Sequence, residues 1–433
     1  MKKFFMLTII LLFSLCLLTY NFYNDSSIDD TSINNIKSQN MLSIMLESSD
    51  GSGNYVMTTQ NSWPTDGYVF NSELSKYENG SVLSWDDTNK KVLFEGNNID
   101  KCYVYFDVYS PPSVADYCTS GQTLSSCITT FGNQGYIISN MYIHNSSLTN
   151  GAGDNSYRYA GANPNNYVCF GSDDTTCPSE DLYRIIGLID GKVKLIHAYG
   201  ATTTMLGTDE GYVNTYKGRY NNLSSYYVEN GDLTKIGTYR WNKTGDNTWS
   251  TSTTNTINLN KNFLTYLDNK NIKWKNMITD TTWYVGGMSS NEGAHTNAKT
   301  AYDYEVGANK NTTTVNAKIG LMYVSEYYYG ASPDYWTLPG LDSNGQPSED
   351  QKWWIGEDYG KARNANWLYT GLAEWTISSS SDDSGQAFYV VIFGNMLVTS
   401  ITDYALRPTF NLSSSVKFVS GEGTVVNPIR IKL

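Results

Sequence analysis

Histidine is the side chain that most often moves protons near neutral pH, and this chain has three, His144, His197 and His295, in separate segments. A serine nucleophile needs a neighbouring base, and the sequence contains no Gly-x-Ser-x-Gly turn that would present such a serine. None of the three histidines has a distinctive sequence context. We therefore expect ordinary core or surface histidines rather than catalytic bases or metal ligands.

Carboxylates are the second candidate for chemistry, because the chain has 42 Asp and Glu residues. A glycosidase needs two carboxylates at a set separation. Five acids are available late in the chain, but no spacing singles out a pair: Glu349, Asp350, Glu357, Asp358 and Glu374. For Glu374 we expect a structural role beside Trp375. We predict no catalytic residue, and the protein is not expected to be an enzyme.

Calcium prefers cages of oxygen ligands, and the acidic pairs Asp173-Asp174 and Asp382-Asp383 could contribute to one. Neither pair is accompanied by a complete ligand pattern. We interpret both as solvated acidic loops, so the sequence predicts no metal and no cofactor.

Five cysteines lie outside the apolar N-terminal run: Cys102, Cys118, Cys127, Cys169 and Cys177. Five choices of the leftover thiol and three pairings of the rest allow about 15 two-bridge arrangements. The simplest pairs near neighbours, Cys118 with Cys127 and Cys169 with Cys177, and leaves Cys102 alone. A zinc site is the alternative, but these spacings do not match CxxC knuckles, so disulfides are favoured.

A polar loop at 378–384 is followed by a strongly apolar stretch at 387–399. In a strand, side chains alternate between faces, so Phe388 and Val390 would oppose Tyr389, Val391 and Phe393. An exposed aromatic face would be a recognition surface, and the alternative is a strand buried on both sides. The predicted contact residues are Trp367, Thr370, Ala373, Ser379, Ser380, Asp383, Tyr389, Val391, Phe393, Asn395, Leu397, Val398, Thr399, Ser400, Thr402 and Asp403.

The elements that must position these residues fall into four segments. Residues 1–23 read as a signal peptide or signal-anchor, since Lys2 and Lys3 precede an apolar run without a small-residue cleavage site. Residues 24–40 read as a polar stalk. Residues 41–110 form a small β module of short β-prone runs. A larger domain follows at 114–433, after Pro111-Pro112.

The larger domain is expected to be α+β. Its best hairpin joins 182–189 to 192–196 through Asp190-Gly191, a strong signal for a type I′ turn. Leu259, Phe263, Tyr266 and Leu267 predict one face of a helix, capped by Asn258 or Asn255. A buried strand is expected at 317–324, and short strands fill the region after residue 371.

Net charge is −12 for the whole chain, from 30 Lys and Arg against 42 Asp and Glu. A phosphate-backbone binder needs clustered basic residues, so a nucleic-acid partner is not expected. The same balance argues against docking on an anionic membrane surface. The membrane partner expected here is met through the N-terminal segment alone.

Two motifs carry a family resemblance. GLAEWT at 371–376, followed about thirty residues later by ALRP at 405–408, resembles the end of a C-type-lectin fold, in the branch shared with formylglycine-generating (sulfatase-modifying) enzymes. The Gly/Asn/Tyr-rich stretch at 151–161 and the ending at 420–428 are similar to exported bacterial proteins with this domain. Some of these resemble the variable target proteins of diversity-generating retroelements.

The resemblance also shows departures. Formylglycine-generating enzymes need two late active-site cysteines, whereas the last cysteine here is Cys177. The lectin calcium loop is matched imperfectly at 346–350, and no Trp-Asn-Asp follows. In the small β module the resemblance implies a cysteine near Tyr77 paired with the position of Cys102, and this chain has Tyr77 instead.

The resemblance implies a receptor- or adhesin-like protein on the extracellular face of a bacterial envelope, membrane-anchored or secreted. It would present a C-terminal, retroelement-diversified surface to an unknown protein or glycan ligand. The alternatives are a glycan-directed enzyme of the same fold and a structural envelope protein.

Overall fold

The structure of the 433-residue chain is a computed structural model. It describes residues 42–48, 52–58, 63–64, 67–78, 83–86, 91–93, 101–108, 112–219, 232–289, 296–337, 357–392, 394 and 396–433. The predicted leader and stalk, at 1–40, lie outside this part. The described residues form two compact units that separate between Pro111 and Pro112, and the chain is mixed α+β, as expected.

The first unit is built from strands. Its four-stranded sheet has the order β2-β1-β6-β3, with β1 parallel to β6 and a separate β4–β5 hairpin. The strands are β1 (Leu42–Glu47), β2 (Tyr55–Met57), β3 (Tyr68–Tyr77), β4 (Ser84–Asp86), β5 (Lys91–Leu93) and β6 (Cys102–Val108). Ile44, Val104 and Phe106 form its core with Trp63. Burial alternates over Leu42–Met45 of β1 and over Cys102–Asp107 of β6, as expected for strands with one face on the core.

Cys102 is a buried free thiol at the start of β6, and its direct cross-strand neighbour on β3 is Tyr77. The position that the resemblance assigns to a second cysteine therefore faces Cys102. Burial raises the pKa of the Cys102 thiol to about 11, so the thiol stays protonated.

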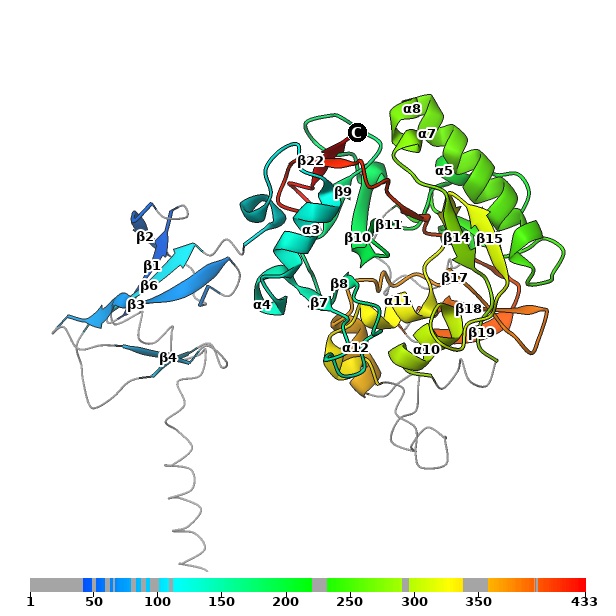
Figure 1. Ribbon diagram of the computed structural model, residues 1–433. Helices are drawn as coiled ribbons and strands as arrows, with labels where there is room; N and C mark the ends of the chain where they lie inside the picture. Colours follow the sequence, from blue (N-terminus) through cyan, green and yellow to red (C-terminus); the bar gives the residue numbers. More distant parts are fainter. Residues whose placement is uncertain are drawn as a thin grey trace, which may run out of the picture. The chain divides into compact units, whose positions relative to one another are not determined.

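The second unit contains two larger sheets (Figure 1). The first runs β16-β21-β11-β10-β8-β7, with β9 also paired to β10. Its strands are β7 (Met141–Ile143), β8 (Tyr157–Tyr159), β9 (Tyr167–Cys169), β10 (Leu182–Ile189), β11 (Lys192–His197), β16 (Ile319–Gly320) and β21 (Thr409–Asn411). The predicted hairpin is confirmed, because β10 pairs with β11 and both Asp190 and Gly191 have positive φ.

The other sheet has the order β12-β13-β20-β17-β18-β19, which leaves β19 at one edge. Its strands are β12 (Tyr212–Thr215), β13 (Gly237–Arg240), β17 (Glu374–Ser379), β18 (Gln386–Val390), β19 (Met396–Ser400) and β20 (Asp403–Ala405). Most of it comes from the C-terminal run of predicted strands. Two short hairpins complete the strands: β14 (Thr281–Tyr284) with β15 (Thr314–Ala317), and β22 (Lys417–Ser420) with β23 (Arg430–Lys432).

Helices fill the connections. They are η1 (Val114–Tyr117), α3 (Leu124–Gly132), α4 (Tyr136–Ser139), η2 (Ser179–Asp181), α5 (Thr203–Leu206), α6 (Tyr216–Arg219), η3 (Trp249–Thr251), η4 (Thr254–Phe263), α7 (Leu264–Lys270), α8 (Ile272–Asn276), α10 (Ala298–Glu305), α11 (Val324–Tyr329), η5 (Pro333–Tyr335) and α12 (Glu357–Asn364). Within the described ranges, no helix is both long and apolar enough to cross a membrane.

The helix predicted around residues 258–267 exists as η4 and α7, but its predicted caps are wrong. The helix begins at Thr254, and the Asn258 side chain instead donates to the Leu206 carbonyl at 3.0 Å. The buried strand expected at 317–324 shrinks to Ile319–Gly320, since α11 begins at Val324. Tertiary hydrogen bonds contribute to both outcomes, since the Glu305 carboxylate accepts the Val324 and Ser325 N–H groups at the start of α11, and such bonds compete with local capping and strand pairing.

The two motifs of the resemblance meet in the core of the second unit. Glu374, at the start of β17, lies 3.3 Å from the Arg407 guanidinium, and both side chains are buried. Arg407 also donates to the carbonyls of His197 and Leu368, each at 2.9 Å. Glu374 is therefore part of a structural ion pair that connects β17 with the segment before β21.

Candidate functional site

The strand pair β18–β19 has two unlike faces. Phe388 and Val390 are fully buried, whereas Tyr389 and Val391 are half-buried. Tyr389 pairs directly with Leu397 of β19, so the two side chains share the outer face. One face thus belongs to the core, and the other is partly open to solvent.

An aromatic cluster stiffens this outer face. The rings of Tyr389 and Tyr404 are stacked, with centroids 4.3 Å apart and planes 5° from parallel. Trp375 packs edge-on against Tyr404 at 4.7 Å, and its indole N–H donates to the Tyr239 carbonyl at 2.9 Å. Burial raises the pKa of Tyr389, so its hydroxyl stays neutral. The cluster crosses three strands and presents a fixed partly apolar surface.

The polar loop between β17 and β18 is held from one side by Asn247. The Asn247 side-chain nitrogen lies within hydrogen-bonding distance of the carbonyl oxygens of Ser380, Asp383 and Gln386, at 2.8, 3.0 and 2.9 Å. The Asp383 carboxylate accepts the Gly385 N–H at 2.8 Å. Residues 381–384 are exposed on this preorganised loop.

Six predicted contact residues are buried instead: Trp367, Thr370, Ala373, Ser379, Ser380 and Asp403. Trp367 donates its indole N–H to the Tyr159 carbonyl at 3.0 Å, and Arg184 lies over its ring. Asp403 accepts from Arg219 at 3.0 Å and from Thr238 at 3.1 Å. These residues position the fold, so their prediction as surface contacts is corrected.

The remaining predicted contact residues divide by their exposure to solvent. Asp383 and Ser400 are exposed, whereas a second group is partly exposed: Tyr389, Val391, Leu397, Val398, Thr399 and Thr402. Phe393 and Asn395 lie outside the described residues. We call the outer face of β18–β19, together with loop 381–384, the contact face. It is the part of the expected surface that is at least partly exposed.

His144 and His197, the two histidines that the structure describes, are both buried and contact backbone groups. Burial lowers the pKa of His144 to about 3, and its Nδ1 accepts the Ala152 N–H at 3.0 Å. His197 is buried between the carbonyl oxygens of Tyr199 and Glu180, and burial lowers its pKa. His295, like Glu349 and Asp350, lies outside the described residues, and Glu357 and Asp358 lie in α12.

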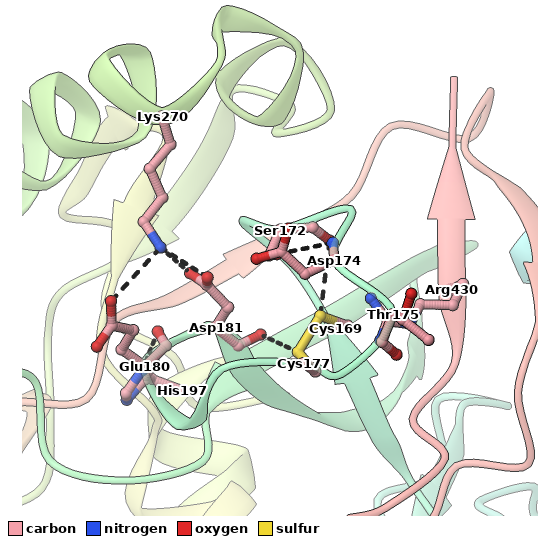
Figure 2. The surroundings of a disulfide bond; sticks show 10 residues. All are labelled: Cys169, Ser172, Asp174, Thr175, Cys177, Glu180, Asp181, His197, Lys270 and Arg430. Carbon is pink, nitrogen blue, oxygen red and sulfur yellow. Dashed lines mark hydrogen bonds and ion pairs between the residues drawn. A yellow bond between two sulfur atoms is a disulfide. The ribbon is translucent and has the colours of Figure 1, made fainter.

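Both predicted disulfides are present, Cys118–Cys127 and Cys169–Cys177. Figure 2 shows the second, with Lys270 reaching both carboxylate oxygens of Asp181 at 2.6 Å. Arg430 donates to the Thr175 carbonyl at 2.8 Å beside the bridged loop. Asp173 is ion-paired with Lys273. Among the described residues, no group of three or more His, Cys, Asp or Glu side chains could hold a metal ion.

A pocket of about 460 Å³ lies where β11, β14, α10 and α11 meet. Its floor contains the buried ion pair of Lys194 and Glu326, with Nζ and Oε1 2.5 Å apart. Sequence reasoning missed these residues. The available signal was a lysine, Lys194, between the apolar residues Val193 and Leu195, since lysine is almost never buried without a partner.

Comparisons with protein families, with curated proteins and with solved structures find no match to this chain. The function of this chain is therefore inferred from the geometry of its surface and pocket.

Proposed function

We propose that this chain is an exported ligand-binding protein, receptor- or adhesin-like, that uses the contact face to hold a protein or glycan. The observation that carries the proposal is the partly exposed aromatic and polar surface built on rigid supports. Tyr389 is stacked on Tyr404, and the Asn247 side chain donates to a carbonyl group of the neighbouring loop 381–384. A preorganised surface loses little conformational entropy when a ligand binds.

The place of action follows from the cysteines. Two disulfides indicate an oxidising, extracellular environment. Anchoring of the chain in a bacterial membrane by residues 1–23 is part of the proposal. So is a C-type-lectin-like identity for the second unit, which is supported by the buried contact between Glu374 and Arg407 of the two resembling motifs.

The geometry supports the two alternative functions, a structural envelope protein and a glycan-directed enzyme, less well. A structural envelope protein would bury the outer face of β18, but Tyr389 and Val391 are partly exposed. A glycan-directed enzyme needs a protonated acid beside its substrate. The pocket at Lys194 is lined by Asp154 and Glu326 among its acidic residues. Burial raises the pKa of Asp154, but Arg158 and hydrogen bonds from Ser156 outweigh it and lower the pKa to about 2. Glu326 is held by Lys194.

The contact face can be tested by selecting binders from a defined glycan array and a displayed peptide library against the full chain. We expect Leu397→Asp and Thr399→Arg, both on the face of β19 that carries the partner of Tyr389, to weaken the selected binders roughly tenfold or more, because each places a charge in the contact. Val213→Asp is the matched control, since Val213 lies on β12 at the opposite edge of the same sheet and is 40% exposed. Equal binding by all three variants, or no selected binder, would refute the proposal.

Retroelement diversification is the finer part of this proposal. Sequencing the neighbourhood of the gene should reveal a reverse transcriptase and a near-copy of the segment that encodes about residues 367–408. Mismatches at template adenines should map to exposed positions such as Asp383 and Ser400, and not to the buried Trp367. A neighbourhood with neither feature would remove this part and leave ligand binding standing.

A further inference from the structure

The pocket at Lys194 is separate from the contact face and has a built polar floor. Lys194 lies on β11 and Glu326 on α11, and both side chains are about 95% buried. Glu326 accepts from Lys194 through one carboxylate oxygen and from the Tyr323 N–H through the other, at 3.0 Å. The carboxylate is therefore fixed, and it holds the ammonium in place.

Lys194 keeps donor capacity toward the pocket. An ammonium has three N–H donors, and Glu326 is its one hydrogen-bond partner within the described ranges. Asn411, directly opposite Lys194 on β21, donates to Thr281 at 3.1 Å, while its side-chain oxygen accepts no bond from the described residues. The floor thus offers N–H donors and an amide acceptor side by side.

Aromatic rings surround this polar floor. The Lys194 ammonium lies 4.8 Å from the ring centres of both Trp283 and Tyr323. Tyr284, beside Trp283 on β14, and Tyr302 on α10 are half-buried and also line the pocket, and the Lys310 ammonium lies 4.8 Å from the ring centre of Tyr284. Ring faces pack well against the C–H faces of a small molecule.

The charges of the residues that line the pocket indicate which class of polar ligand fits it best. Four basic and four acidic side chains line the pocket, so the lining has no net charge. A phosphate or carboxylate ligand calls for an excess of cations, and a quaternary amine calls for an aromatic cage without a resident cation. Here the protein's own lysine occupies the space between Trp283 and Tyr323.

We propose that this pocket binds a neutral sugar ring. Adjacent hydroxyls would accept from Lys194 and donate to Asn411, and the C–H face of the ring would pack on Tyr284 or Tyr302. A volume of about 460 Å³ lies within the usual range for small-molecule sites and suits one or two rings. The inference goes beyond the contact face, because it assigns a second site with lining residues of its own.

The probes are glucose, galactose, mannose and N-acetylglucosamine, with inorganic phosphate and choline as charged comparisons, measured by ligand-observed NMR on the full chain. We expect saturable binding of at least one sugar and of neither charged probe. Lys194→Met should weaken that binding roughly tenfold or more, because it removes charged hydrogen bonds. Lys235→Met is the matched control, since it removes an exposed lysine paired with Asp232.

Tyr284→Ala provides a second variant if Lys194→Met does not fold, because the hydrogen bonds of Tyr284 with Tyr323 use its backbone. It should also weaken sugar binding, whereas Leu397→Asp on the contact face should not. Absence of saturable binding by any of the four sugars, stronger binding of phosphate or choline, or sugar binding unchanged in Lys194→Met and Tyr284→Ala would overturn the inference.

Discussion

At the scale of single residues, burial decides what each titratable group does. His144 is fully buried, its pKa is lowered to about 3 chiefly by that burial, and Arg158 contributes in the same direction while Asp154 opposes it. A neutral imidazole that accepts from the Ala152 N–H supports the loop around residue 152. The sequence context of His144 carries none of this information.

The His144 imidazole predicts a pH dependence of stability. The folded state keeps it neutral down to about pH 3, whereas the unfolded chain binds a proton below about pH 6.5. The stabilisation is therefore complete above about pH 6.5 and is lost as the pH falls toward 3, by up to about 1.4 kcal/mol per pH unit. Denaturant unfolding of the second unit between pH 7 and pH 5 measures this slope.

His144→Gln is the control for that measurement, since it keeps an acceptor for the Ala152 N–H and does not titrate. Its stability should fall less steeply with decreasing pH, and His197, also buried with a lowered pKa, should account for part of the slope that remains. The same slope in both proteins would mean that His144 is protonated in the folded state.

At the scale of elements, register determines which side chains meet. The pairing of β3 with β6 places Tyr77 opposite Cys102, and the neighbouring Glu78 N–H donates to the Lys101 carbonyl at 2.7 Å. Because hydrogen-bonded and non-hydrogen-bonded pairs alternate, Tyr77 and Cys102 form a non-hydrogen-bonded pair with their Cβ atoms close together. That spacing suits a disulfide.

Tyr77→Cys should therefore restore a cross-strand bridge to Cys102 when the full chain is made under oxidising conditions. Reducing the bridge should destabilise the first unit by about 2–4 kcal/mol, because the bridge restricts the unfolded chain. Thiol titration in denaturant, before and after reduction, detects the bond. Lys76→Cys is the control, since Lys76 is exposed on the other face of β3 and the thiol introduced there should remain free. If Cys102 stays a free thiol in the oxidised Tyr77→Cys variant, the register is contradicted.

At the scale of the whole molecule, two sites arise from different kinds of chain contact. The contact face is almost local in sequence, because β17, β18 and β19 follow one another. The pocket is lined by residues spread from Asp154 to Asn411, including members of β11, β14, α10, α11 and β21. A ligand-binding function at the first site and a sugar site at the second can therefore fail or succeed independently.

Local patterns in the sequence determined the elements whose causes are local. Asp190-Gly191 specified a turn with positive φ, the β-prone runs after residue 386 indicated the strands β18 and β19, and the short cysteine spacings indicated both disulfides. Each of these outcomes depends on residues within about ten positions of one another, where propensity and periodicity act.

Tertiary structure alone decided which polar residues are exposed and which charges meet. Trp367 and Asp403 looked like surface contacts, but Arg184 and Arg219 from distant segments bury or pair them. Lys194 and Glu326 are 132 positions apart, and their ion pair exists because β11 and α11 pack together. Ion pairing depends on the whole packed chain, so the apolar surroundings of Lys194 in the sequence could indicate that it is buried but could not identify Glu326 as its partner.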